Sequence, residues 1–225
     1  MDIKRLSVPG KGGVVPAILI KPAHPRGAAI IMHGYGGNKE EQLGLGLVAA
    51  EAGLTTCVLD LRGHGEHPLP LDESIGADID AVLHFCSQFG KVTAIGHSLG
   101  GRLALTSDAD YHIAISPSLS RTYGEHTQEL LRTLRSYRVR PPDLSILLSV
   151  QENIPVWDPT TDAGNTFILF AERDAPEISA GCTTLKSAGV RVVRVPGAMH
   201  GDIFLLEQTF AAVREQILQW YGSGN

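Results

Sequence analysis

The sequence predicts an α/β protein in which a mostly parallel sheet of about eight strands is covered by helices on both faces. Short, β-branched apolar runs alternate with segments of helical periodicity along most of the 225 residues. Glycine-rich turns follow several of these runs, and one run passes directly into a Gly-x-Ser-x-Gly turn that opens a helix. We expect a single domain over residues 1–225, with a small insertion at about 117–165.

The elements follow in order from the apolar pattern. Residues 3–8 and 14–21 flank a glycine-rich turn, which is typical of an N-terminal β-hairpin. Asn38, followed three residues later by Glu41, resembles the start of a helix that runs to residue 52. The other expected strands are 28–32, 54–59, 92–95, 112–116, 167–171 and 190–195, and the other expected helices are 75–89, the segment after residue 98, 127–138, 141–150, 177–188 and 202–221.

The composition excludes several classes of function. A formal net charge of −5 provides no field that would attract nucleic acid or an anionic membrane surface. Neither an apolar signal segment near the N-terminus nor an apolar run of membrane-spanning length is found, so we expect a cytoplasmic protein. The three cysteines are odd in number and lack metal-ligand spacing, which indicates buried thiols in a reducing compartment: Cys57, Cys86 and Cys182.

The insertion at 117–165 is too long for a plain connection, and insertions of this length are usually functional. We therefore expect a cap over the site. Its first expected helix carries three arginines, which either attract an acidic partner or substrate or form a solvated face. The second reading is favoured because Glu125 and Glu129 dilute the charge. The arginines are Arg132, Arg135 and Arg138.

The chemistry is centred on Ser98. A buried strand at 92–95 runs without a linker into a turn with Ser98 at its apex and glycines at positions 96 and 100. Such a sharp turn leaves no room for side chains two residues before and two residues after the serine. The hydroxyl is therefore raised above the carboxyl edge of the sheet, where the free N–H of Leu99 and the helix dipole favour negative charge.

A serine nucleophile needs a base, and the base needs an orienting acid. Asp174 and His200 each follow a predicted strand, in the order Ser, Asp, His that this architecture uses. Taken alone, Asp174 could equally cap a helix and His200 could bond the backbone of its loop. Three matches at three strand ends favour a catalytic triad, with Glu172 as the reserve acid and Asp202 as a weaker one.

The oxyanion of an acyl-transfer intermediate needs two donors. One is expected to be the N–H of Leu99. The other should come from the loop after an earlier strand, where residues 33–37 read His-Gly-Tyr-Gly-Gly, so the N–H of Tyr35 is the predicted donor. The alternative is a plain glycine-rich turn.

These motifs together resemble the serine hydrolases of the α/β-hydrolase superfamily. The similarity rests on HGYGG at 33–37, DLRGHG at 60–65, GHSLGG at 96–101 and the strand ends that carry Asp174 and His200. It is closest to the compact branch with monoacylglycerol-lipase-like, serine-aminopeptidase-like and dienelactone-hydrolase-like members, whose variable cap would correspond to 117–165. Ser98 stands where dienelactone hydrolases carry Cys and where dehalogenases and epoxide hydrolases carry Asp, which argues against those activities.

No metal or cofactor is expected. His64 and His67 lie in one loop without a third ligand nearby and are interpreted as structural, and His97 is expected to pack the turn around Ser98. The segment at 44–49 matches a loose dinucleotide pattern, but it follows a helix start where that pattern requires a strand.

The sequence thus predicts a carboxylesterase that cleaves small, soluble esters of short-to-medium acyl chains through an acyl-enzyme on Ser98. Other reactions of the same triad stay open, namely those of a thioesterase, a peptidase or a carbon–carbon hydrolase, as does a non-catalytic small-molecule-binding protein of this fold. The sequence does not address the oligomeric state. The acyl pocket is expected to be bounded by Tyr35, Trp157, Leu144, Leu147 and Leu148.

Overall fold

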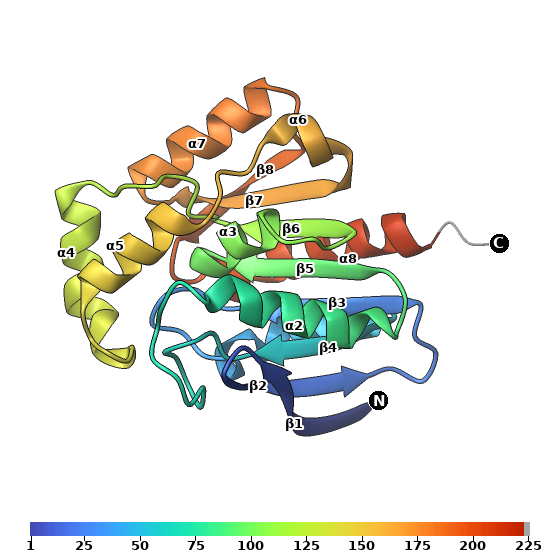
Figure 1. Cartoon of the computed structure of the whole chain (residues 1–225). Coiled ribbons are helices and arrows are strands. Elements are labelled where there is room, and N and C mark those ends of the chain that lie inside the picture. The colour runs from blue at the N-terminus through green and yellow to red at the C-terminus, as the bar shows by residue number, and fades with distance from the viewer. Residues whose placement is uncertain (223–225) are drawn as a thin grey trace.

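The computed structural model describes residues 1–222 and contains one eight-stranded sheet in the order β1-β2-β4-β3-β5-β6-β7-β8 (Figure 1). The N-terminal hairpin pairs antiparallel, and β2 pairs antiparallel with β4, whereas all further pairs are parallel. The predicted mostly parallel sheet is confirmed. The strands are β1 Asp2–Gly10, β2 Gly13–Lys21, β3 Gly27–Met32, β4 Leu54–Leu59, β5 Val92–His97, β6 Tyr111–Ile115, β7 Thr166–Arg173 and β8 Val192–Met199.

Helices cover both faces of the sheet. Along β3, Ile30 packs in a core shared with α2 and α3, while the next residue, Ile31, packs on the opposite face in a core shared with α1 and α8. Because both faces are buried, the parallel strands are apolar without alternation. The helices are α1 Leu43–Glu51, α2 Ile75–Ser87, α3 Leu99–Leu105, α4 Glu125–Leu134, α5 Leu144–Asn153, α6 Pro159–Asp162, α7 Pro176–Ser187 and α8 Glu207–Tyr221.

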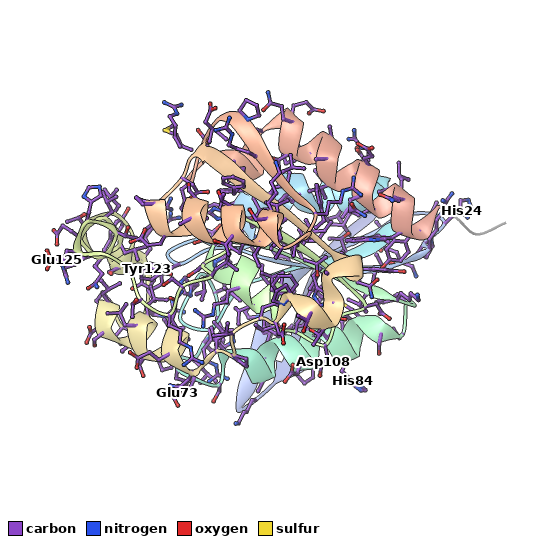
Figure 2. All side chains as sticks on the ribbon, turned by 90° about the horizontal axis from the view of Figure 1, so that it is seen from above. His24, Glu73, His84, Asp108, Tyr123 and Glu125 are labelled. Carbon is purple, nitrogen blue, oxygen red and sulfur yellow. The ribbon has the colours of Figure 1, made fainter. Side chains whose placement is uncertain are left out.

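The segment 117–165 lies beyond the carboxyl edge of the sheet. Figure 1 shows α4 and α5 past the ends of the central strands, so this segment covers the edge where the loops after the strands meet. Figure 2 shows Tyr123 and Glu125, at the beginning of α4, on the side of the molecule opposite to His24. No helix among residues 1–222 has the length and hydropathy that a membrane span requires.

Several predicted helices have different bounds in the structure, and three of them differ by four residues or more at one end. The helix expected from residue 38 begins as a 3-10 turn, Glu40–Gln42, in which Asn38 Oδ1 accepts a hydrogen bond from the Glu41 N–H at 3.0 Å. The helix expected at 127–138 ends at Leu134. The one expected from residue 202 starts at Glu207, after another 3-10 turn. Each difference lies at a helix end, where local side-chain bonds compete with helix geometry.

The loops that follow β3 and β4 are tied together by buried charges. Asp60, which is fully buried, accepts hydrogen bonds from Lys39 N at 2.8 Å, Lys39 Nζ at 2.6 Å and Glu66 N at 2.8 Å. Arg62 donates to Asp78 through Nε at 2.8 Å and Nη2 at 3.0 Å. The DLRGHG segment therefore fixes the position of the glycine-rich loop at 33–37 relative to the sheet. The three cysteines are buried and free, as predicted.

Candidate active site

The turn at Ser98 has the strained geometry that the glycine spacing predicts. Ser98 has φ 55° and ψ −112°, a left-handed conformation that non-glycine residues rarely adopt. A Cβ on Gly96 would overlap the carbonyl oxygen of Gly100, and a Cβ on Gly100 would lie 2.5 Å from the carbonyl oxygen of Met32. Both glycines are therefore required by backbone contacts between β5, α3 and β3.

Ser98, His200 and Asp174 are brought together in one chain of hydrogen bonds. Ser98 Oγ lies 3.1 Å from His200 Nε2, and His200 Nδ1 lies 2.7 Å from Asp174 Oδ1. Because Nδ1 faces a carboxylate, it carries the proton, and Nε2 is left to accept one from the serine hydroxyl. Three chain segments meet here, namely the β5–α3 turn, the loop after β7 and the loop after β8.

The reserve acids named from the sequence lie elsewhere. Glu172 is exposed and accepts a hydrogen bond from the Gly197 N–H at 2.9 Å, and Asp202 Oδ1 accepts one from the Met199 N–H at 2.7 Å. Neither carboxylate bonds His200 in the structure. Asp174 is also not the N-cap residue of α7, which is Ala175.

The Asp174 carboxylate is buried and surrounded by donors. Its side chain is fully inaccessible to solvent and accepts hydrogen bonds from Ser116 Oγ, from Ala171 N at 3.0 Å and from Ala175 N at 2.9 Å. Burial by itself raises the pKa of Asp174, but the bonds with His200, Ser116 and Ala171 outweigh burial and hold it below its ordinary value. The carboxylate thus stays ionised beside the imidazole.

Ser116 was missed by the sequence reasoning. It follows β6 at the same edge of the sheet, which was the available signal, and it has φ 45°. Its backbone N–H donates to the Leu169 carbonyl at 2.7 Å, so the hydroxyl is held toward Asp174.

His97 supports the loop that carries His200. Its Nε2 donates to the His200 carbonyl oxygen at 2.8 Å, and its ring lies 4.9 Å from the His200 ring and 4.7 Å from the Phe204 ring between centroids. Burial holds the pKa of His97 well below its ordinary value, helped by the charges of His200 and Arg135. His97 is therefore neutral, and its packing against the Ser98 turn agrees with the prediction.

The glycine-rich loop after β3 lies against the serine. A Cβ on Gly34 would be 3.1 Å from Ser98 Cβ, so the loop backbone approaches the nucleophile closely at this point. Leu99 is the first residue of α3, and its N–H has no carbonyl of a preceding helical turn to bond. The Tyr35 side chain is buried and donates from Oη to Ser136 Oγ at 3.1 Å, which ties the loop to the segment after α4.

A small cavity of about 50 Å³ opens beside Ser98. It is bounded by the glycine-rich loop, the 3-10 turn before α1, the end of α4 and the loop after β8. Its lining residues are Gly34, Tyr35, Gly37, Glu41, Gln42, His97, Ser98, Leu131, Arg135, His200 and Phe204.

Of the five residues expected to bound the acyl pocket, Tyr35 lines this cavity, and the other four lie elsewhere. Leu144 and Leu147 are on the face of α5 that is buried in the main core, and Leu148 borders a separate groove beside Arg132. Trp157 packs against the core under α7, because the chain returns there toward β7. Figure 1 shows the following helix, α6, well away from α4.

The arginines of the insertion, for which a solvated face was the favoured reading, do not share one environment. Arg132 is exposed and pairs with Glu129 at 2.6 Å, as that reading expects. Arg138 pairs with Glu41 at 2.5 Å, across to the turn before α1. Arg135 instead lines the cavity beside Ser98. No sequence signal separated Arg135 from its neighbours, because its direction depends on where α4 ends.

Within residues 1–222, no group of three or more His, Cys, Asp or Glu side chains is placed to hold a metal ion. The two histidines of the loop after β4, His64 and His67, have structural surroundings. The ring of His64 lies 5.0 Å from that of His33 and 5.7 Å from that of Tyr35, and His67 Nε2 lies 3.3 Å from Asp78 Oδ2.

Comparison with known proteins agrees with this architecture. A family model described as the alpha/beta hydrolase fold matches residues 29–117, a range that includes the Ser98 turn. No curated protein sequence matches the chain significantly. Among solved structures, Est1E from Butyrivibrio proteoclasticus is similar with a TM-score of 0.69 at 19% identity, over 97% of this chain and 99% of that one.

Two further solved structures show the same likeness. A structure from a study of carboxylesterases of the thaumarchaeon Nitrososphaera gargenis has a TM-score of 0.72 at 15% identity, covering 97% of this chain and 99% of that one. The Pyrobaculum calidifontis esterase has a TM-score of 0.65 at 21% identity, covering 98% of this chain and 85% of that one. The chain therefore has the α/β-hydrolase fold, and several of its distant structural neighbours are esterases.

Proposed function

We propose that this α/β-hydrolase is a serine carboxylesterase that cleaves small esters through an acyl-enzyme on Ser98. The observation that supports it best is the hydrogen-bond chain from Ser98 Oγ through His200 to the buried carboxylate of Asp174. Nucleophile, base and acid lie in the order and at the distances that acyl transfer requires. The esterases among the structural neighbours agree with this choice of reaction.

In the proposed mechanism, His200 Nε2 takes the hydroxyl proton of Ser98 as Oγ attacks the ester carbonyl carbon. Asp174 keeps the imidazole in the required tautomer and stabilises the imidazolium that forms. The backbone N–H groups of Leu99 and Tyr35 donate to the oxyanion. His200 then gives its proton to the leaving alcohol, and later activates the water that releases the acid from Ser98.

The proposed substrates have short-to-medium acyl chains, with the optimum at the short end. The cavity of about 50 Å³ is far smaller than the roughly 300–1,000 Å³ of sites that enclose drug-sized ligands. We further propose that residues 1–225 act as one domain with 117–165 as its cap, and that the protein works in the cytoplasm, where its three free thiols stay reduced.

The test is hydrolysis of p-nitrophenyl esters from acetate to octanoate. We expect wild-type activity to be highest for the shortest chains and Ser98→Ala to lower kcat by about a thousandfold or more, with an unchanged unfolding transition. Ser107→Ala is the matched control, because that hydroxyl only bonds the Ala104 carbonyl at the end of α3.

A fluorophosphonate probe separates an enzyme from a binding protein of the same fold. We expect the probe to label Ser98 in the wild type and in Ser107→Ala, but not in Ser98→Ala. A folded wild-type protein that neither turns over any ester of the series nor reacts with the probe would contradict the proposed function.

A further inference from the structure

The wall of the cavity beside Ser98 carries a positively charged side chain that the proposed mechanism does not use. Arg135 lies one residue after α4, is partly buried, and lines the cavity together with Ser98 and His200. A Cβ placed on Gly201 would lie 3.6 Å from Arg135 Nη2, so the guanidinium lies beside the backbone that follows His200. A positive charge is thus within the space where a substrate must sit.

This guanidinium has no partner among residues 1–222, which distinguishes it from its neighbours. Arg132 and Arg138, three residues to either side, are paired with Glu129 and Glu41 respectively. The only carboxylate that lines the cavity is Glu41, and Arg138 already holds it. A partly desolvated charge without a counterion is unfavourable, which indicates that an anion completes the site.

The position of Arg135 is fixed by its backbone. Its N–H donates to the Leu131 carbonyl at 3.1 Å at the end of α4. Gly36, with φ 71°, lies so close that a Cβ there would be 2.9 Å from both the Cβ and the carbonyl oxygen of Arg135. The arginine therefore rests directly on the loop that carries the proposed oxyanion donor Tyr35.

A second polar group in the same cavity lacks a partner. The Gln42 side chain is buried, and no residue of the described chain bonds its Oε1. Oxygen and nitrogen of a side-chain amide exchange places by a half-turn, so Gln42 can present either a donor or an acceptor to a bound molecule. Gln42 and Arg135 come from different elements, the turn before α1 and the end of α4, and both line the space beside Ser98.

We propose that the physiological substrate is an ester that carries a carboxylate, and that Arg135 binds this carboxylate and so determines specificity. The proposal rests on the proposed esterase function and adds the charge of the substrate to it. A guanidinium binds a carboxylate through two parallel hydrogen bonds, which fixes both the position and the orientation of the ester relative to Ser98.

The test compares esters that differ only in one charge. On the alcohol side the pair is 4-acetoxybenzoate and its methyl ester, and on the acyl side it is mono-(4-nitrophenyl) adipate and its methyl ester. The measured quantity is the ratio of kcat/KM for the charged ester to kcat/KM for the neutral one, which removes general effects on folding or chemistry. We expect Arg135→Ala to lower this ratio about tenfold or more in at least one pair.

Two further variants separate a specific contact between Arg135 and the substrate carboxylate from a general electrostatic effect of positive charge. Arg135→Lys retains the charge without the bidentate geometry, so we expect it to lower the ratio less than Arg135→Ala does. Arg132→Ala removes a charge from the same helix on its solvent side and should leave both ratios within about twofold. Equal ratios in wild type and Arg135→Ala for both pairs would overturn the proposal, while turnover of the neutral esters would leave the esterase function intact.

Binding provides a readout that needs no turnover. In the Ser98→Ala background, calorimetry should show that 4-acetoxybenzoate binds at least tenfold more weakly when Arg135→Ala is added, with its methyl ester as the neutral reference. The same affinity with and without Arg135, or no binding of the anion at all, would overturn the proposal even if the protein hydrolysed none of the esters.

Discussion

At the scale of single residues, the site depends on positions where only a hydrogen atom fits. Gly100 lies in the first turn of α3, where a Cβ would be 2.5 Å from the carbonyl oxygen of Met32 and 2.6 Å from that of His33. Both oxygens belong to the backbone where β3 ends, so neither can move without shifting the glycine-rich loop. For Gly76, in the first turn of α2, a Cβ would have no atom within 4 Å among residues 1–222, apart from its chain neighbours and the backbone of its own helix.

These two glycines make a matched pair of substitutions. Gly100→Ala should lower the free energy of unfolding by about 3 kcal/mol, because the methyl group is forced against backbone. Gly76→Ala should raise the free energy of unfolding by about 0.5 kcal/mol, because the added methyl group causes no clash in the folded protein and restricts the backbone of the unfolded chain. Urea denaturation measures both, and similar effects of the two substitutions would contradict this account of the serine turn.

At the scale of elements, the loops after β3 and β4 each bury a neutral histidine. His33 donates from Nδ1 to the Gly34 carbonyl at 2.8 Å and accepts at Nε2 from the Leu61 N–H at 3.0 Å, so both nitrogens are used in the neutral form. Burial lowers the pKa of His33 to about 4. Burial, with the nearby charge of His33, lowers the pKa of His64 to about 3.

These shifts predict a loss of stability in mild acid. Between pH 6.5 and about 4 the unfolded chain binds protons at both histidines while the folded chain does not, so stability falls as the pH is lowered. Each histidine contributes about 1.4 kcal/mol per pH unit in this window, or about 2 kcal/mol at pH 5. Urea denaturation at pH 7, 6 and 5 measures the slope.

Substitutions test whether the histidines of these loops cause the pH dependence of the free energy of unfolding. In His64→Asn the amide can still donate to the Arg62 carbonyl, which His64 Nδ1 contacts at 2.9 Å, but it does not titrate, so we expect a shallower slope. His24→Asn is the control, because His24 is exposed and lies on the side of the molecule opposite to Tyr123 and Glu125 (Figure 2). An unchanged slope in His64→Asn would mean that other groups cause the pH dependence.

At the scale of the whole molecule, one buried arginine joins the nucleophile helix to two separate stretches of the insertion. Arg102 of α3 is 2% exposed and donates to the Ser120 carbonyl through Nη1 at 2.8 Å and to the Ile154 carbonyl through Nη2 at 2.9 Å. Burial lowers the pKa of Arg102. Since α3 begins directly after Ser98, the same helix positions the nucleophile and the segment above it.

Loss of this connection should loosen the insertion. We expect Arg102→Met to lower the free energy of unfolding by about 2–3 kcal/mol and to speed amide hydrogen exchange in α4 and α5 more than in the central strands. Arg214→Met is the control, because its pair with Glu51 at 3.3 Å is exposed and should contribute less than about 1 kcal/mol. Exchange that rises equally in all elements would contradict a local role for Arg102.

Much of this site could be predicted because its residues are tied to strand ends. Ser98, Asp174 and His200 each follow an apolar run, and parallel strands bring their carboxyl ends to one edge. The positions of Trp157 and the leucines of α5 could not be predicted, because their apolar pattern shows that they are buried but does not show in which cluster. Arg135 was misread because its direction depends on contacts with the glycine-rich loop.

The sequence by itself determined the sheet, the strained serine turn and the order of the three polar residues, because strand periodicity and glycine spacing are local properties of the chain. Only the tertiary structure decided which arginine enters the cavity, which donor holds Asp174 and how small the space beside Ser98 is. Those features arise where segments separated by tens of residues pack together. Close packing of that kind depends on the shapes of all the partners at once, and no local pattern encodes it.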